Sequence, residues 1–552
     1  MTEMHLYKAL AEIFVREQVE VVFTLTGDGN MHWEASYSEH EGVKSYHVRH
    51  EHCACAMATA YASATGRIGV ASVTCGPGLT QIMTALATAA QARIPLLVFV
   101  GETPINAAWY NQAIDQGPLV RAAGAHYISA HSIQQVVAQT REAFIIAGTQ
   151  RRPVVIGVPL DMQQQMIAFE HYRPSSEIIH DEGPRVPHSD YLARATQRIR
   201  EARKIIIIGG RGAKTGGAAD ACQVFAERFD AALAETLPVR GLFAGNPRSI
   251  GIAGGFAHRA TRDAFEECDL VIAVGSSLSQ HTSDSNRLFR PQDVILIDDQ
   301  PPALKHGQKT SEFVIAGDAR LTLEALLATF DDIGGTRPDS HWDVAAYSRR
   351  VREERADVTP YPVPSGTLDP RDIVAHLDKA LPKDWRYVNA SGHCSYFSAH
   401  INGVQAESFL TIREFGAIGN GLCYAIGMAA SAPNETVVLF DGDGGLMMHA
   451  QELETVQRYN LKVLICVFND GAFGSEIHKL RADQLSDHGA IYGRTDLSSI
   501  ARGFGLRGAV VTDLAQVPAL LDEFETGDTA MIWDFQVSDQ VMSPVMRRAT
   551  TR

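Results

Sequence analysis

Short runs of apolar residues recur along this chain of 552 residues and constrain its fold more than any other feature. Runs that are almost entirely apolar, and too short for most helices, are typical of strands that a parallel sheet buries on both faces. Amphipathic stretches separate them, which indicates an alternation of strands and helices. The clearest runs are 70–74, 95–101, 152–160, 204–210, 270–275, 294–298, 436–440 and 462–468.

Two polar, proline-containing stretches, at about 172–189 and 331–366, divide these runs into three blocks. Such stretches are typical of linkers. We therefore predict an α/β protein of three domains, at residues 1–172, 190–330 and 366–552, each built on a doubly wound parallel sheet. For the basic end of the chain, from Met546 to Arg552, we expect a disordered tail in preference to a lid over an anionic substrate.

The net charge of −15, from 49 basic and 64 acidic residues, argues against a nucleic-acid or membrane binder, because both need clustered Lys and Arg. No apolar run approaches the ~18 residues of a membrane span, and no secretory signal pattern is visible. The eight cysteines are scattered without CxxC pairs, so we expect no disulfide framework. We expect Cys53 and Cys55 to be buried as small hydrophobic residues. We predict a cytoplasmic protein.

The most informative segment lies in the third block. A buried strand leads into the glycine-rich turn Asp441–Gly445, and a helix follows with one apolar face over 446–456. The next buried strand ends in Asn469-Asp470-Gly471. Because this is a βαβ unit, both loops emerge at the same edge of the sheet, beyond the carboxyl ends of the strands.

The two loops offer oxygen ligands at that edge. Asp443 has a carboxylate, Asn469 an amide oxygen and Gly471 a backbone carbonyl, a set that suits Mg²⁺ or Ca²⁺ with a diphosphate completing the shell. Glycines beside a helix N-terminus also let backbone N–H groups approach phosphate oxygens. The glycines in question are Gly442, Gly444 and Gly445.

The order of strand, Gly-Asp-Gly, helix, strand and Asn resembles the cofactor motif of the enzymes that depend on thiamine diphosphate (ThDP). In the first block, residues 48–58 and the Thr74–Gly78 turn look like the pyrimidine-binding domain of the acetolactate synthase and pyruvate decarboxylase superfamily. The resemblance places the glutamate that activates the cofactor pyrimidine at Glu51. It also implies a homodimer or homotetramer, in which Glu51 of one subunit meets Asp443 of another.

Two further segments of the third block match the family. Ile418 occupies the position of the large aliphatic side chain that wedges beneath ThDP and imposes its bent conformation. Gly392 and His393 fall in the family loop near the diphosphate, where the resemblance makes His393 a candidate phosphate contact.

Three residues are candidates for contact with the substrate. Asp28 stands in a segment similar to the Gly-Asp-x-Asn of keto-acid decarboxylases, and is either a catalytic acid/base or a turn former. The chain lacks the adjacent histidines of pyruvate decarboxylases, and Gln112 either orients a substrate carbonyl or lies on the surface. Glu476 follows the metal loop, where family members place groups that face the substrate.

The resemblance implies an enzyme, a ThDP-dependent lyase or transferase. We expect it to decarboxylate a 2-oxo acid such as pyruvate, and to protonate the product or join it to an acceptor carbonyl. The alternatives are a lyase or carboligase that acts without CO₂ loss on an aldehyde, acyloin or diketone, as benzaldehyde lyase and cyclohexanedione hydrolase do, and a catalytically silent binding homologue. FAD is left open but not expected, since residues 275–280 depart from the acetolactate synthase pattern.

Overall fold

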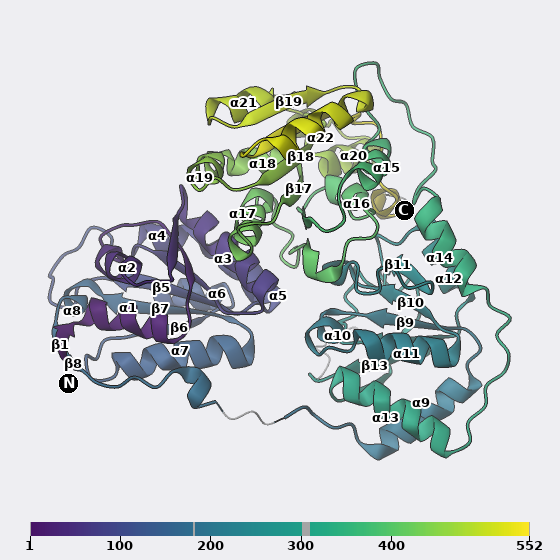
Figure 1. The fold of residues 1–552 in the computed structure, drawn as a ribbon, viewed down its shortest axis with the longest axis horizontal. Coiled ribbons are helices and arrows are strands. Elements are labelled where there is room, and N and C mark those ends of the chain that lie inside the picture. The colour runs from purple at the N-terminus through teal and green to yellow at the C-terminus, as the bar shows by residue number, and fades with distance from the viewer. Residues whose placement is uncertain (1, 180–182, 301–309, 551–552) are drawn as a thin grey trace.

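The computed structural model describes residues 2–179, 183–300 and 310–550. Within these ranges the chain forms three six-stranded parallel sheets and one two-stranded antiparallel pair. Figure 1 shows three layered units, in which helices cover the sheets. The prediction of three α/β domains with doubly wound parallel sheets is confirmed.

The first unit has the strand order β3-β2-β4-β5-β7-β6. Its strands are β2 (Val21–Thr24), β3 (Lys44–His47), β4 (Gly69–Val73), β5 (Leu96–Glu102), β6 (His126–Ser129) and β7 (Pro153–Pro159), with β1 (Thr2–His5) paired to β8 (Met166–Phe169) at one side. Its helices are α1 (Leu6–Arg16), α2 (Met31–Ser38), α3 (Glu51–Thr65), α4 (Pro77–Gln81), α5 (Met83–Ala92), α6 (Gln116–Ala122), α7 (Val136–Gln150) and α8 (Leu160–Gln163).

The central unit has the strand order β11-β10-β9-β12-β13-β14. Its strands are β9 (Ile205–Gly209), β10 (Ala232–Glu235), β11 (Ser249–Ile252), β12 (Leu270–Val274), β13 (Val294–Asp298) and β14 (Phe313–Ala316). Its helices are α9 (Ser189–Glu201), α10 (Arg211–Thr215), α11 (Ala219–Phe229), α12 (Arg259–Glu267), α13 (Ala319–Asp332) and α14 (Val344–Glu353).

The third unit has the strand order β16-β15-β17-β18-β20-β19. Its strands are β15 (Arg386–Asn389), β16 (Phe409–Leu410), β17 (Val437–Gly442), β18 (Val463–Asn469), β19 (Arg507–Val511) and β20 (Met531–Gln536). Its helices are α15 (Pro370–Ala380), α16 (Cys394–Ser398), α17 (Gly421–Ser431), α18 (Asp443–Met448), α19 (Leu453–Arg458), α20 (Gly474–Ala482), α21 (Leu497–Gly503), α22 (Val517–Thr526) and α23 (Pro544–Thr550), with the 3-10 turn η5 (Ala450–Glu452) between α18 and α19.

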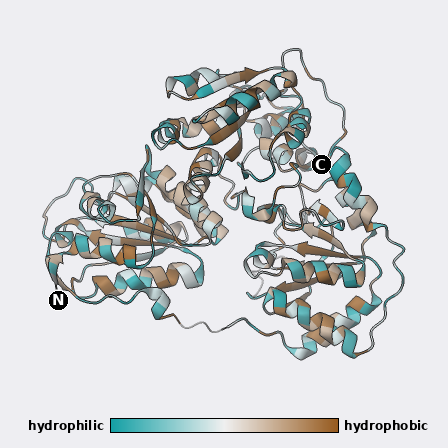
Figure 2. Cartoon of the chain, in the orientation of Figure 1, coloured by the Kyte–Doolittle hydropathy of each residue, from teal (hydrophilic) through white to brown (hydrophobic). Residues whose placement is uncertain are grey.

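The buried strands show why the sequence reads as continuous apolar runs. In β9, Ile205 and Ile207 face one hydrophobic cluster, while Ile206 and Ile208 face another on the opposite side of the sheet. Figure 2 shows the same arrangement, with hydrophobic colour concentrated on the strands and both colours on the surrounding helices. Such strands need apolar side chains on both faces.

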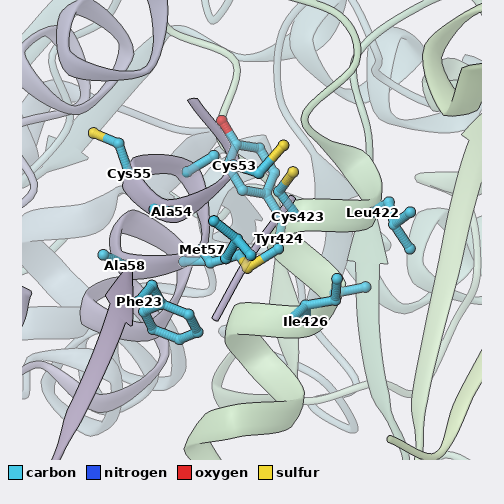
Figure 3. Packing of buried hydrophobic residues seen from close by; sticks show 14 of the residues in the cluster. Phe23, Cys53, Ala54, Cys55, Met57, Ala58, Leu422, Cys423, Tyr424 and Ile426 are labelled. Atoms are coloured by element: carbon cyan, nitrogen blue, oxygen red, sulfur yellow. The ribbon is translucent and has the colours of Figure 1, made fainter. Parts of the chain in front are cut away.

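The first and third units share one core, built on helices α3 and α17. Met57, Cys53 and Cys423 belong to the same cluster of buried residues, and Figure 3 shows the two helices with these side chains between them. A Cβ atom added at Gly427 of α17 would lie 2.2 Å from the carbonyl oxygen of Met57. The helices therefore pack at backbone contact distance, which only glycine at this position permits.

Two arginines of the central unit reach its neighbours. Arg211, directly after β9, donates to the carbonyl oxygen of Ala92 in the first unit and forms an ion pair with Glu414 in the third. Arg240 is buried, pairs with Glu235 at 3.0 Å and donates to the carbonyl oxygen of Ala399 at 3.0 Å. The central unit is thus joined by charged contacts to the other two.

Three sequence expectations are wrong in detail. The helix expected over 446–456 is broken, because His449 leaves the helical conformation (φ −135°, ψ 32°) between α18 and η5. The stretch 331–366, expected to be a linker, contains α14. The expected disordered tail forms α23, where Arg548 binds Asp284 at 3.0 Å and Arg547 binds Asp357 at 2.9 Å; partner carboxylates far away in sequence order these residues.

All eight cysteines are free, and Cys53 and Cys55 are buried, as expected. Among the described residues, no helix combines the length and apolar character that crossing a membrane requires.

Candidate functional site

The glycine-rich turn between β17 and α18 is tightly packed. β17 ends at Gly442, and α18 begins at Asp443. A Cβ atom at Gly445 would lie 2.5 Å from Oδ1 of Asp441, and one at Gly444 would lie 2.6 Å from the hydroxyl of Tyr492. Neither position has room for a side chain of its own, and the Tyr492 hydroxyl packs against the turn at Gly444. A backbone without side chains lets its N–H groups approach an anion closely.

Asn469 lies at the end of β18, the strand next to β17, and is completely buried. Its Nδ2 donates to the carbonyl oxygen of Thr495 at 3.0 Å and to Oδ1 of Asp534 at 2.9 Å. Its Oδ1 is buried and has no hydrogen-bond partner among the described residues. An unpaired buried acceptor is costly, and its orientation is fixed by two bonds to the other end of the amide. The side chain is therefore held ready for a ligand at Oδ1.

Asp443 contacts the loop that follows Asn469. Its Oδ2 accepts the backbone N–H of Gly471 at 3.2 Å, which links the turn after β17 to the turn after β18. The structure thus brings together Asp443 and the loop of Asn469, as the βαβ reasoning predicts.

Two buried carboxyl groups, Asp441 and Asp443, and the half-buried Asp470 lie at this edge of the sheet. Burial raises the pKa of Asp441 to about 8 and that of Asp443 to about 6. Burial, and then the charge of Asp443, raises the pKa of Asp470 to about 8. Carboxylates with these neighbours favour a bound cation, because it offsets the repulsion and the lost hydration. Together with the Asn469 oxygen, they fit a hard divalent ion.

The carbonyl oxygen of Gly471 is engaged by the chain itself. It accepts the backbone N–H groups of Tyr492 at 3.0 Å and Gly493 at 2.9 Å. A carbonyl has two lone pairs. Ligation of a metal by Gly471 therefore requires the 492–493 segment to move away from it.

A second polar cluster lies at the carboxyl edge of the first sheet. The Sγ of Cys75 is 3.2 Å from Oε1 of Gln112, and the hydroxyl of Tyr110 is 3.3 Å from the same oxygen. Burial, and to a lesser degree the charge of Asp28, raises the pKa of Cys75. Asp28 and Gln112 are therefore close to the same thiol, although they are 84 residues apart by number and Asp28 is exposed.

Glu51 begins α3 and is half-buried. The neighbouring residues fix this helix start against the third unit: His52 Nε2 lies 2.6 Å from Oδ1 of Asn420, and the backbone N–H of Arg49 donates to Oε1 of Glu452 at 2.9 Å. The position of Glu51 is thus set by contacts that both units supply.

Models of the thiamine pyrophosphate (ThDP) enzymes match the chain in three places. The N-terminal TPP binding domain matches residues 4–119, the central domain 192–326 and the C-terminal TPP binding domain 390–534. The chain belongs to the thiamine pyrophosphate enzyme family. It is a ThDP-dependent enzyme with all three domains of that family.

Among its relatives are large subunits of acetolactate synthases. The chain is 28% identical to isozyme 2 of Escherichia coli (strain K12), over 88% of this chain and 87% of that protein. It is 27% identical to the subunit of Parasynechococcus marenigrum (92% and 83% covered), and 25% identical to a probable one of Methanococcus aeolicus (96% and 91% covered).

In this ThDP enzyme His393 lies against the start of α20, where a Cβ atom at Gly474 would be 3.1 Å from its Nδ1. Its Nε2 accepts the backbone N–H of Ser543 at 3.1 Å, which leaves the ring proton on Nδ1. Burial, and then nearby His478, lowers the pKa of His393 to about 3. The ring is therefore neutral, and it can offer Nδ1–H to a phosphate as a donor. Gly392, just before it, has φ +127°, which favours glycine.

Ile418 lies in the loop between β16 and α17 and is half-buried. The loop bends at Gly416 and Gly419, whose φ angles are +73° and +90°. A half-buried aliphatic side chain on a loop shaped by glycines fits the position beneath a cofactor.

Glu476 lies on α20, exposed, and pairs with Lys479 at 3.3 Å. Its role toward a substrate stays a prediction. Sequence reasoning missed Asp534 and Thr495, which orient Asn469, as well as Cys75 and Tyr110 beside Gln112. The signal for Asp534 was present, since it is an acidic residue inside the apolar run of β20.

Proposed function

We propose that this ThDP enzyme binds Mg²⁺ and decarboxylates a 2-oxo acid such as pyruvate, then protonates the product or condenses it with an acceptor carbonyl. The observation that carries the metal site is the buried, unpartnered Oδ1 of Asn469 at the same edge as Asp443. The relatives named as acetolactate synthases support a 2-oxo acid substrate and a condensation.

In this proposal Asp443 and Asn469 hold the metal through oxygen, and Gly471 joins them when its carbonyl is released. The backbone at Gly442, Gly444 and Gly445 and the Nδ1–H of His393 hold the diphosphate. ThDP, when bound, supplies a nucleophilic carbon that attacks a carbonyl. Ca²⁺ satisfies the same donors, and FAD is not part of the proposal.

Glu51 has a separate role, which is to hydrogen-bond the pyrimidine ring and favour its activated tautomer. Ile418 supports the bent cofactor from below. We further propose a homodimer or homotetramer and a cytoplasmic location.

Proton transfers to the substrate fall to Asp28, whose exposed carboxylate lies near the Cys75 thiol. Gln112 orients a substrate carbonyl through its amide, and Glu476 closes the pocket from the third domain. The cluster of Gln112, Tyr110 and Cys75 also favours a second candidate function. An amide and a hydroxyl suit the neutral oxygens of an acyloin, aldehyde or diketone, which a lyase or carboligase cleaves or joins without CO₂ loss.

A substrate panel separates the two functions. Purified protein with ThDP and Mg²⁺ is given pyruvate, benzoylformate, acetoin, benzoin or cyclohexane-1,2-dione, and CO₂ and products are measured. CO₂ release from a 2-oxo acid is expected. Turnover of acyloin or diketone alone would overturn the decarboxylase proposal in favour of the second function, and tight ThDP binding without any turnover would indicate a silent homologue.

The role of Glu51 is tested by Glu51→Gln. We expect ThDP binding to persist while activity falls by about 10²–10⁴-fold, because an amide cannot exchange a proton with the pyrimidine ring as a carboxyl group can. Asp443→Ala is the contrasting variant, with weakened ThDP binding in calorimetry. Full activity in Glu51→Gln would refute the assigned role.

A further inference from the structure

A second group of metal-ligating side chains lies outside the ThDP site, where α3 of the first domain meets the end of α18 in the third. His50 precedes α3, Cys53 lies in its first turn, and His449 follows α18. The ligand atoms of these three residues all lie within 4.8 Å of one another. Side chains from two domains thus converge on one point.

The free donor atoms are defined by the surrounding contacts. His50 Nδ1 accepts the backbone N–H of His52 at 3.1 Å, so Nε2 is the nitrogen left for a ligand. His449 Nδ1 is buried and has no hydrogen-bond partner among the described residues. A neutral imidazole nitrogen with a free lone pair is a common metal ligand.

The thiol of Cys53 is the third ligand group, and a polar side chain lies beside it. Glu452 lies beside it, completely buried, with Oε1 held by the backbone of Arg49 and Oε2 by the hydroxyl of Thr455 at 2.6 Å. Because both oxygens are already engaged, Glu452 suits a supporting carboxylate better than a direct ligand. Figure 3 shows Cys53 turned toward Cys423 on α17, whereas Cys55 points away on the other side of α3.

The donors select the metal. Two imidazoles and one thiolate are typical of Zn²⁺, which takes Cys and His in tetrahedral sites and keeps a fourth position for water. Donor atoms around Zn²⁺ lie about 3.5 Å apart, so the three groups need to close by roughly 1 Å through side-chain rotation. The oxygen donors at Asp443 and Asn469 prefer Mg²⁺, and the two sites therefore differ in chemistry.

We propose that His50, Cys53 and His449 bind Zn²⁺ and clamp the first domain to the third at the start of α3, one residue before Glu51. Binding replaces the S–H bond of Cys53 with a sulfur–zinc bond, and the proton is released to solvent. Three bonds to one ion fix a helix start that otherwise depends on single hydrogen bonds.

The test uses the full-length enzyme, first freed of metals with a chelator and then returned to ThDP and Mg²⁺. It is titrated with Zn²⁺ and, separately, with Co²⁺. We expect one Zn²⁺ per chain by elemental analysis, about one proton released per ion, and a thiolate-to-cobalt charge-transfer band in the absorption spectrum.

Variants decide which residues are responsible. Cys53→Ser and His449→Gln are expected to lose the bound Zn²⁺ and the cobalt band, while Cys55→Ser, a buried cysteine two residues away, retains both. If Cys53→Ser fails to fold, His449→Gln alone decides. Absence of stoichiometric Zn²⁺ in the unmutated enzyme, a cobalt spectrum without the thiolate band, or equal loss in Cys55→Ser would overturn the proposal.

Discussion

Asp534→Ala tests whether Asn469 is held in position for a metal. The carboxylate of Asp534 is completely buried and accepts Nδ2 of Asn469 at 2.9 Å through Oδ1. Its Oδ2 accepts the backbone N–H of Leu497 at 3.2 Å. Without Asp534, the Asn469 amide keeps one of its two fixed bonds, to Thr495, and its Oδ1 is less well aimed.

The expected effect follows from these contacts. Loss of a group that orients a metal ligand typically weakens metal affinity about 10–100-fold, which is about 1.4–2.7 kcal/mol. The N–H groups of Leu497 and Asn469 left without an acceptor cost about 1–3 kcal/mol each in folding stability. The measurement is ThDP binding by calorimetry at a series of Mg²⁺ concentrations, which needs no knowledge of the substrate. We expect the half-saturating Mg²⁺ concentration to rise while binding at saturating Mg²⁺ is retained.

Asp496→Ala is the matched control. Asp496 directly precedes α21. Its carboxylate is half exposed and caps this helix by accepting the backbone N–H of Ser499 at 3.0 Å. Losing this cap costs about 1 kcal/mol of stability without touching Asn469. Asp534 does not position Asn469 for a metal if the folded Asp534→Ala variant keeps the Mg²⁺ dependence of the unmutated enzyme, or if Asp496→Ala weakens Mg²⁺ binding as strongly.

Three other changes test the glycine-rich turn and the contact between the central and third units. Gly445→Ala puts a Cβ atom 2.5 Å from Oδ1 of Asp441, so we expect weaker ThDP binding in calorimetry and a lower melting temperature. Arg240→Met leaves Glu235, which is 1% exposed, as an unpaired buried charge, and should cost about 3–5 kcal/mol in urea unfolding. Burial lowers the pKa of His400 from 6.5 to about 3. Below pH 6.5 the unfolded chain therefore binds a proton that the folded chain does not, and the folded state loses stability as the pH decreases. His400→Leu should therefore lessen the loss of unfolding free energy between pH 7 and pH 5 by about 2 kcal/mol. The same loss of unfolding free energy in the variant and the unmutated protein would contradict this.

The three-domain fold and the oxygen ligands at one sheet edge were predictable because each buried parallel strand is visible in the sequence as a short apolar run. The run at 436–440 became β17 (Val437–Gly442) and that at 462–468 became β18 (Val463–Asn469). Neighbouring parallel strands end at one edge, so Asp443 and the loop after Asn469 had to meet. A short apolar run followed by Gly or Asn carries this information without any knowledge of distant contacts.

The missed features depend on distant contacts. Asp534 is 65 residues beyond Asn469, and no spacing rule connects β20 to the amide that it orients. The apolar spacing of 446, 450, 453 and 456 persists through the break at His449, so periodicity could not reveal it. Likewise α23 is ordered by Asp284 and Asp357, which lie in other parts of the chain. Local pattern cannot reveal order that a remote carboxylate imposes.

The close packing of α3 against α17 has a consequence for how such a protein can be encoded. Because Gly427 meets the Met57 carbonyl and both helices contribute to one core, the two outer domains adhere without a covalent link between them. A gene split within either connecting stretch would yield fragments that recognise each other through this seam.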